Sequence, residues 1–196
     1  MNILVSGGTG FIGSALTRSL VMDGHKLWIL TRDPARFVPS ENVQAVAWDG
    51  RSSQGWLDVF SRMDAVVNLA GETIGRWPWT VERKKRIQDS RVQAGQAIAE
   101  AYNLASTRPP VLIQASGIGY YGPLDSRPVT EADRPGMDFI AQVAVAWEDS
   151  TSRVEMLPDV RRVIIRTSLV LDKQQGVLPL MALPVRFFAG GPLGSG

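Results

Sequence analysis

The chain has 196 residues, a net charge of +2 and 44% hydrophobic residues, which suits a globular domain with a sizeable core. It has no cysteine and a single histidine, His25, which excludes disulfides, thiolate chemistry and a histidine-rich metal site. Charges of both signs are interspersed, and no apolar run reaches the ~18 residues of a membrane span. We therefore expect a cytoplasmic protein that has no signal peptide, binds no metal or nucleic acid and does not enter a membrane.

The first predicted element is a strand at residues 3–5, which runs into a glycine-rich turn and a helix that begins at Phe11. This order places a helix N-terminus, with its unpaired N–H groups and positive dipole end, under a diphosphate. Gly7 allows a sharp turn, Gly10 keeps side chains away from the ligand, and Gly13 allows close packing on the strand. The context predicts a dinucleotide site rather than an ordinary βα turn. The coenzyme contacts expected here are Gly7, Thr9, Gly10, Phe11, Ile12 and Gly13.

A second strand at residues 26–30 leads to the position where such folds read the adenosine ribose. Arg32 stands there, and its planar fork suits the extra phosphate of NADP, so NADP is favoured over NAD. Asp33 competes for a ribose contact, although Asp33 followed by Pro34 is also typical of a helix N-cap. The alternative for Arg32 is a simple surface position.

The third and fourth strands, predicted at residues 43–48 and 64–69, each end in a candidate contact for the coenzyme. Asp49 could accept a hydrogen bond from the adenine amino group, or it could only form an Asp-Gly turn. The fourth strand is nearly all apolar, as expected for a parallel strand that is buried on both faces. Small residues at its end would let the coenzyme lie against the chain. The expected contacts are Leu69, Ala70 and Gly71.

The remaining pattern continues the alternation of strands and helices. This predicts an α/β fold with a doubly wound, mostly parallel sheet. We interpret residues 1–170 as a dinucleotide-binding domain of the Rossmann type. The further elements predicted are helices at 56–60, 81–106 and 138–155, strands at 111–115 and 162–171, a loop at 123–137, and a tail without clear period at 174–196.

Several of these segments resemble a known family. Residues 7–13, 68–71 and 120–122 are similar to the extended short-chain dehydrogenase/reductases. The similarity is greater to an atypical, sugar-nucleotide epimerase-like branch that is also labelled cell-division-inhibitor-like. The segments similar to this branch are 76–77, 89–91, 147–148 and 190–196.

The resemblance covers essentially the whole chain. It implies NADP binding, a substrate site after the fourth, fifth and sixth strands, a nucleotide sugar or related small-molecule substrate, and a homodimer through the two long helices. Members of the branch continue past the segment that ends this chain. Residues 171–196 are accordingly expected to be the incomplete start of a substrate-binding region.

The catalytic set that the resemblance implies is incomplete in this chain. Extended members use Ser or Thr with a Tyr-x-x-x-Lys pair, in which the tyrosine is the acid/base and the lysine lowers its pKa. No tyrosine here has a lysine four residues later, and Phe139 and Val143 stand where the pair would be. The expected hydroxyl position holds Gly117, and Arg91 replaces an asparagine of the usual proton relay.

Replacement groups can be proposed from residues near the strand ends. Ser116 and Tyr121 are the predicted catalytic residues, with Tyr120 and Glu72 as further candidates for the acid/base. Glu72 and Arg91 are predicted to contact substrate, and Arg91 or Arg166 could hold an anionic group. The alternative for Glu72 is a loop cap, and the alternative for Arg91 and Arg166 is a structural salt bridge. Two functions stay open: an NADP-dependent epimerase or oxidoreductase, and a non-catalytic NADPH-binding sensor.

Overall fold

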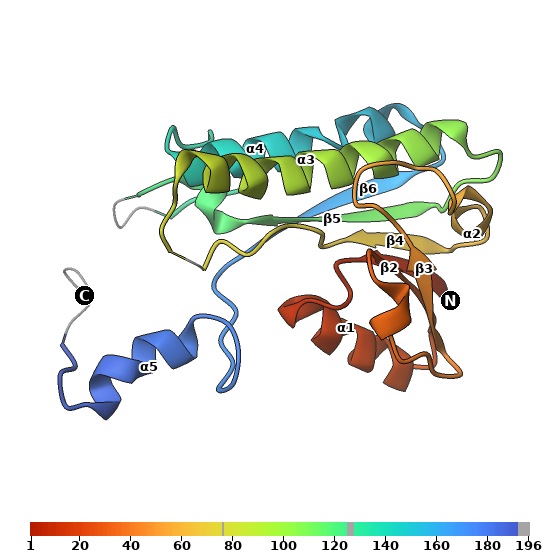
Figure 1. Ribbon diagram of the computed structural model, residues 1–196. Coiled ribbons are helices and arrows are strands. Elements are labelled where there is room, and N and C mark those ends of the chain that lie inside the picture. Colours follow the sequence, from red (N-terminus) through yellow and green to blue (C-terminus); the bar gives the residue numbers. More distant parts are fainter. Residues whose placement is uncertain (76, 125–127, 192–196) are drawn as a thin grey trace.

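A computed structural model describes residues 1–75, 77–124 and 128–191 of the chain. Arg76 and residues 192–196, which contribute to the resemblance, lie outside these ranges. The described strands form one parallel sheet in the order β3-β2-β1-β4-β5-β6 (Figure 1). The order reverses direction between β1 and β4, which is the switch point where doubly wound sheets bind ligands. The strands are β1 Asn2–Ser6, β2 Lys26–Thr31, β3 Val43–Ala47, β4 Ala65–Asn68, β5 Val111–Gly117 and β6 Arg161–Thr167.

Helices cover both faces of the sheet, as the alternating pattern predicts. In Figure 1, α1 lies on one face, and α3 and α4 lie side by side on the other. The helix α5 stands away from the sheet. The α-helices are α1 Phe11–Met22, α2 Leu57–Phe60, α3 Val81–Leu104, α4 Phe139–Asp149 and α5 Leu178–Arg186. Short 3-10 turns are η1 Pro34–Arg36, η2 Ile118–Tyr121 and η3 Ser152–Met156.

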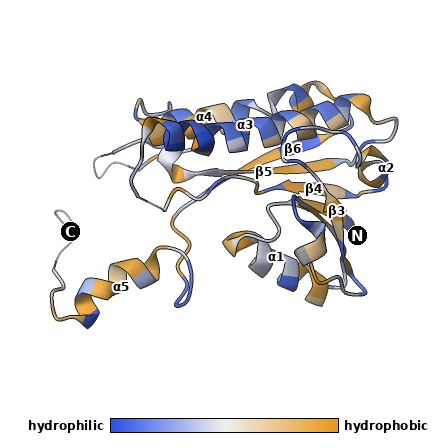
Figure 2. Ribbon diagram, in the orientation of Figure 1, coloured by the Kyte–Doolittle hydropathy of each residue, from blue (hydrophilic) through white to orange (hydrophobic). Residues whose placement is uncertain are grey.

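The core has one apolar cluster on each face of the sheet, because side chains of successive strand residues point to opposite faces. Leu4 belongs to the cluster that packs against α3, and its neighbour Val5 belongs to the cluster on the α1 side. The strands are therefore largely apolar, as Figure 2 shows for much of β4 and β5. Members on the α3 side include Leu4, Val66, Leu112, Ala97, Ile98 and Tyr102; those on the α1 side include Val5, Ile29, Val67, Leu16 and Leu20.

The last third of the chain differs in detail from the prediction. The tail contains α5, whose apolar period is hidden by Pro179 in its first turn and by Pro184 within it. Proline is compatible with a first helical turn, so Pro179 does not prevent the helix. The predicted helix at 138–155 is divided at Thr151, which is fully buried and leads into η3. The last strand is also shorter than predicted and ends at Thr167.

A line of buried polar side chains joins the ends of β1 and β4 to the middle of β5. Ser6 and Asn68 are register partners, as are Asn68 and Gln114, and all three are 0% exposed. The Ser6 hydroxyl donates to Asn68 Oδ1 at 2.6 Å, and Asn68 Nδ2 donates to Gln114 Oε1 at 2.8 Å. Because buried polar groups are costly without partners, this line fixes the strand register next to the site.

Replacing the central member should therefore destabilise the sheet. We expect Asn68→Leu to lower the free energy of unfolding by about 2–3 kcal/mol, since it leaves the Ser6 hydroxyl without its acceptor and removes a donor from Gln114. Asn103→Leu, on the exposed face of α3, is the matched control and should change stability by less than about 0.5 kcal/mol. Urea denaturation measures both; equal small effects would show that the line of polar groups does not stabilise the fold.

Candidate coenzyme and substrate site

The turn between β1 and α1 brings backbone against backbone at the switch point. Gly7 has φ +72°, and a Cβ placed on it would lie 2.7 Å from the Leu69 carbonyl oxygen. A Cβ on Gly13 would lie 2.1 Å from the Gly7 carbonyl oxygen, so only glycine allows this approach of helix to turn. The Gly10 amide donates to the Gly7 carbonyl at 3.0 Å and closes the turn. These positions fulfil the packing roles expected from the sequence.

The N-terminus of α1 presents unpaired amides at this point. Its N-cap, Gly10, has an extended backbone and makes no side-chain cap. The first intrahelical bond runs from the Ser14 amide to the Gly10 carbonyl at 2.8 Å, so the amides of residues 11–13 precede the helical ladder. Thr9 and Ile12 are exposed beside them. A side-chain-free turn with free N–H groups and a positive dipole end suits a diphosphate.

A cavity of about 420 Å³ lies beside the ends of β2 and β3. Arg32 lines it together with Asp49, and the Arg32 Cδ lies 4.0 Å from a Cβ built on Gly50. Asp49 Oδ1 accepts hydrogen bonds from the amides of Arg51 and Ser52, both at 2.8 Å, and these bonds lower the pKa of the Asp49 carboxyl. Asp49 therefore forms the turn that the sequence offered as one alternative, and the same turn shapes a space beside Arg32.

The end of β4 supports the glycine turn and covers a half-buried arginine, Arg91. The Leu69 amide donates to the Ser6 carbonyl at 3.1 Å, which holds residues 69–71 beside the turn. A Cβ on Gly71 would lie 2.9 Å from Arg91 Cζ. Arg91 Nη1 donates to the carbonyls of Glu72 and Ile87, each at 2.9 Å, and burial lowers the Arg91 pKa to about 10. The guanidinium also stacks on Trp147, 4.9 Å from the ring centre.

Glu72 lies in an arginine cluster at the start of α3. Its carboxylate accepts from Arg83 at 3.2 Å and pairs with Arg86 at 3.4 Å. Its amide nitrogen donates to the Ser90 hydroxyl at 2.9 Å. The sequence offered a loop cap as the alternative for Glu72 and did not identify these partners. Glu72 thus ties the loop after β4 to the first turns of α3.

The structure joins Ser116 and Tyr121 through one ion pair, in which Glu148 is buried and Arg166 is partly exposed. The Ser116 hydroxyl donates to Glu148 Oε1 at 2.6 Å. Arg166 donates to both oxygens of Glu148, from Nε and from Nη2, each at 2.8 Å. Arg166 Nη1 also donates to the Tyr121 phenolic oxygen at 2.9 Å. Hydrogen bonding to Glu148, ahead of that to Tyr121, raises the pKa of Arg166 despite partial burial.

Arg166 uses four of its five N–H donors in hydrogen bonds within the protein. Its guanidinium carbon lies 3.5 Å from the ring centre of Tyr120, and Nη1 makes a further bond to the Glu131 carbonyl at 3.2 Å. The Arg166 and Glu148 side chains are 16% and 8% exposed. Arg166 is therefore a positioning group rather than a free anion binder. The sequence analysis did not single out Glu148 as a site residue. The available signal was its spacing of four residues from Ala144, which places both on the buried face of α4.

The two α4 positions where the family has its Tyr-x-x-x-Lys pair hold the apolar residues Phe139 and Val143. Phe139 packs edge-on against Trp79, with ring centres 5.7 Å apart, and Lys84 lies 5.2 Å from its ring centre. Val143 is buried. Neither position offers a titratable side chain, so any proton transfer at this end of the sheet must use other groups.

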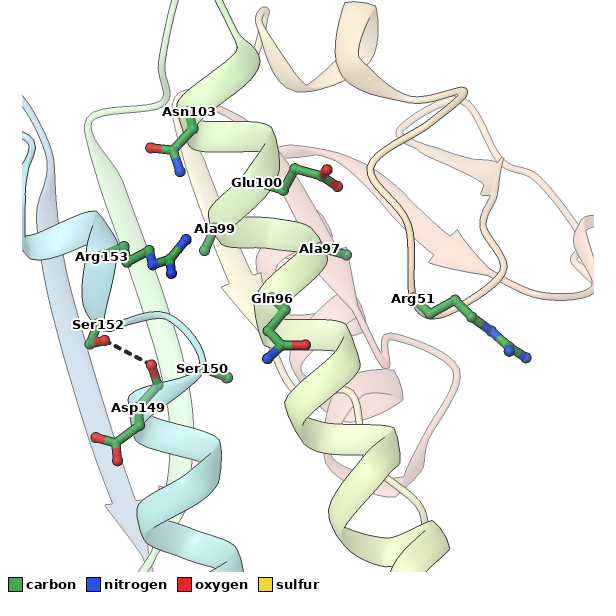
Figure 3. A pocket seen from close by; sticks show the side chains of 10 residues that line it. All are labelled: Arg51, Gln96, Ala97, Ala99, Glu100, Asn103, Asp149, Ser150, Ser152 and Arg153. Carbon is green, nitrogen blue, oxygen red and sulfur yellow. Dashed lines mark hydrogen bonds between the residues drawn. The ribbon is translucent and has the colours of Figure 1, made fainter.

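A larger cavity of about 500 Å³ lies on the outer surface of α3, toward its C-terminal end (Figure 3). Gln96, Glu100 and Asn103 project from α3 there, opposite Asp149 and Arg153. Its lining comes from α3, from residues at the junction of α4 and η3, and from Arg51 after β3, and includes no residue of the glycine turn. Its lining is polar, and dimerisation through these helices stays a prediction.

Comparisons with known proteins agree with this geometry. A sequence model of the NAD dependent epimerase/dehydratase family matches residues 3–145. An epimerase family protein from Staphylococcus saprophyticus is 38% identical over 98% of this chain and 63% of its own length. The crystal structure of human epimerase family protein SDR39U1 with NADPH has a TM-score of 0.79 at 31% identity, and covers 100% of this chain and 63% of that one.

A nucleoside-diphosphate sugar epimerase from Corynebacterium glutamicum has a TM-score of 0.79 at 29% identity, over 100% of this chain and 39% of its own. The chain thus spans less than two thirds of the length of these proteins. Within the described ranges, no helix combines the length and the apolar character needed to cross a membrane.

The buried ion pair yields a stability prediction. Arg166→Met should lower the free energy of unfolding by about 3–5 kcal/mol, because it leaves the Glu148 carboxylate buried without its cation. Lys85→Met breaks an exposed pair with Asp89 on α3 and should cost less than about 0.5 kcal/mol. Chemical denaturation followed by circular dichroism compares the two variants. A loss no larger for Arg166→Met than for Lys85→Met would contradict the central place given to the Glu148–Arg166 pair.

Proposed function

Because the chain belongs to the NAD-dependent epimerase/dehydratase family, we propose that it binds NADP at the carboxyl edge of its sheet and acts as an epimerase or oxidoreductase. The proposed substrate is a nucleotide sugar or a related carbonyl compound. The observation that carries the proposal is the glycine turn, where any side chain at residue 7 or 13 would collide with backbone beneath free helix amides. A cytoplasmic location, a homodimer and a substrate-binding role for residues 171–196 stay predictions.

The residues present fit the coenzyme along its length. The amides of residues 11–13 would hold the diphosphate, and Arg32 would pair with the phosphate on the adenosine ribose. Asp49 would border the adenine in the adjoining cavity, and residues 69–71 would lie against the nicotinamide half. The related human protein crystallised with NADPH, which favours NADP for this chain.

The proposed chemistry depends on the network after β5. The coenzyme, when bound, supplies reversible hydride transfer. Tyr121 would move the proton at its phenolic oxygen, which Arg166 Nη1 holds in place at 2.9 Å. Ser116 would orient the substrate from the end of β5, and its bond to Glu148 sets the direction of its hydroxyl. Glu72 and Arg91 remain proposed substrate contacts, near the end of β4.

A second candidate function is a non-catalytic NADPH-binding sensor. The specific observation in its favour is that both proposed catalytic hydroxyls already have protein partners, Glu148 for Ser116 and Arg166 for Tyr121. The place of the usual tyrosine-lysine pair is filled by Phe139 and Val143. In this case the coenzyme would act as a ligand that changes the affinity of a protein partner.

Coenzyme choice tests the role of Arg32. Arg32→Ala should weaken NADPH binding by about 1.5–3 kcal/mol and leave NADH nearly unchanged, since a charged hydrogen bond to the phosphate is lost. Arg51→Ala, a nearby surface arginine that does not line the 420 Å³ cavity, is the matched control and should affect both coenzymes little. Thermal shift titrations with each coenzyme give the affinities. Equal losses for NADPH and NADH in Arg32→Ala would show that Arg32 does not read the phosphate.

Turnover separates the two candidate functions. With NADP⁺ and a panel of nucleotide sugars the chain should show isomer exchange, and with NADPH and related carbonyl compounds it should show coenzyme oxidation. Tyr121→Phe should reduce either rate by about 10²–10⁴-fold. Tyr120→Phe, which keeps the ring stacked on Arg166, is the control and should retain most activity. Tight NADPH binding without any turnover, together with a partner whose affinity follows NADPH, would favour the sensor.

A further inference from the structure

Arg91 is a half-buried cation of α3 that forms no ion pair with a carboxylate in the part of the chain that the structure describes. Its hydrogen bonds run from Nη1 to the neutral carbonyls of Glu72 and Ile87. The Glu72 carboxylate itself pairs with Arg83 and Arg86, at 3.2 and 3.4 Å. Burial lowers the pKa of Arg91 to about 10, and Glu72 offsets only part of this effect. A cation that loses water without gaining a carboxylate favours an anion from outside the protein.

One edge of the Arg91 guanidinium is free. Nη1 makes both of the hydrogen bonds named above, whereas Nε and Nη2 have no hydrogen-bond partner among the described residues. Neither of these two nitrogens is fully buried, so a ligand can reach them. Nε and Nη2 donate in parallel, and their spacing matches the two oxygens of a carboxylate. The free edge therefore suits a bidentate contact with a planar acid group.

Trp147 of α4 supplies both a support for this guanidinium and a further donor. Its ring centre lies 4.9 Å from Arg91 Cζ, and the stacked ring limits the directions in which the guanidinium can turn. Trp147 Nε1 is buried and has no partner within the described ranges. Buried N–H groups are costly without an acceptor, so an unpaired one next to an arginine with free donors indicates that a ligand supplies the acceptor. We call Arg91 and Trp147 the Arg–Trp pair.

The Arg–Trp pair lies where the ends of β4 and β5 meet α3 and α4. Arg91 holds the Glu72 carbonyl, in the loop after β4. Trp147 directly precedes Glu148, whose carboxylate accepts from Ser116 near the end of β5 at 2.6 Å. Ligands of doubly wound sheets bind outside these strand ends, so an anion held by the pair would belong to the part of the substrate next to Ser116.

Position and geometry favour a carboxylate over the diphosphate of a nucleotide sugar. The diphosphate is separated from the sugar carbon that reacts, whereas the Arg–Trp pair adjoins the network of Ser116 and Glu148. A planar carboxylate also matches the two donors of one guanidinium edge. Arg83 and Arg86, at the start of α3, are already paired with Glu72 and do not supply the further charge that a diphosphate needs.

From these observations we infer that the Arg–Trp pair binds a carboxylate on the reacting part of the substrate, and that the substrates are hydroxy acids or oxo acids, such as uronic acids carried by a nucleotide. Arg91 holds both carboxylate oxygens through Nε and Nη2, and Trp147 Nε1 donates to one of them. The inference rests on the proposed function and names a substrate class that the coenzyme site does not specify. The carboxylate keeps its bonds during the reaction and serves only to orient the neighbouring carbon.

NMR of the indole N–H groups tests the site in the unmodified chain, without coenzyme. D-Glucuronate titrated into the ¹⁵N-labelled chain should shift the Trp147 Nε1–H signal, which is identified by its loss in Trp147→Phe. D-Glucose, the matched neutral sugar, should leave the signal unchanged. Inorganic phosphate at equal ionic strength should bind at least about tenfold more weakly than D-glucuronate, because it does not match the planar arrangement of donors.

Substitutions of the pair provide the second measurement. Arg91→Gln should raise the Kd for D-glucuronate by at least about tenfold, since the charged hydrogen bonds are lost. Trp147→Phe keeps a ring beneath Arg91 and removes only the Nε1 donor, so it should raise the Kd by about fivefold. Arg18→Gln is the matched control: it removes an exposed positive charge from α1, on the other face of the sheet, and should change the Kd by less than about twofold.

The outcomes separate this inference from the proposed function. A Trp147 signal that does not respond to D-glucuronate, an equal affinity for phosphate, or equal Kd changes in Arg91→Gln and Arg18→Gln would overturn the carboxylate site and leave the coenzyme site intact. Absence of any NADPH binding, seen as no thermal shift in the unmodified chain, would overturn the proposed function, whereas the indole titration would still decide whether the Arg–Trp pair binds a carboxylate.

Discussion

The close contact between the start of α1 and the ends of β1 and β4 is the constraint on which the site depends. Gly13 lies so near the Gly7 carbonyl that a single methyl group would occupy the same space. Gly7 in turn lies against the backbone of Leu69 at the end of β4. These contacts hold the free amides of α1 at the switch point of the sheet, and the buried line from Ser6 to Gln114 keeps the supporting strands in register.

A second constraint governs the other half of the site. Glu148 and Arg166 bring together α4 and β6, and through Ser116 and Tyr121 they also fix the end of β5 and η2. Because the Glu148 carboxylate is buried, it needs the Arg166 cation, and the pair cannot be released for ligand binding at low cost. This makes Arg166 a fixed cation beside a phenol, which is a different solution from a tyrosine and lysine on one helix. The proton transfer proposed for Tyr121 depends on Arg166 taking the place of that lysine.

The fold was predictable from the sequence because local signals and the alternation of elements agree. The apolar strands, the glycine turn and the long amphipathic helix at α3 all lie within a few residues of their predicted ranges. The glycine turn was likewise predictable, since glycines in one short stretch indicate a close backbone contact. The prolines of α5 concealed a helix, because they interrupt the pattern that identifies one.

The partners of the catalytic candidates could not be predicted. Ser116 and Glu148 are 32 positions apart, and Arg166 is 45 positions from Tyr121, so no local pattern connects them. The same holds for Phe11 and Gly176, which meet only because the chain returns across the sheet edge. Arg91 was predicted to contact an anionic substrate group, whereas its contacts with Gly71 and Trp147 depend on tertiary packing.

The most direct test of the central claim is a crystal structure of the chain grown with NADPH. It should show the diphosphate on the amides of residues 11–13 and the ribose phosphate within hydrogen-bond distance of Arg32. An NADPH molecule bound elsewhere, or a glycine turn that stays without ligand at saturating NADPH, would contradict the assignment of this edge of the sheet as the coenzyme site.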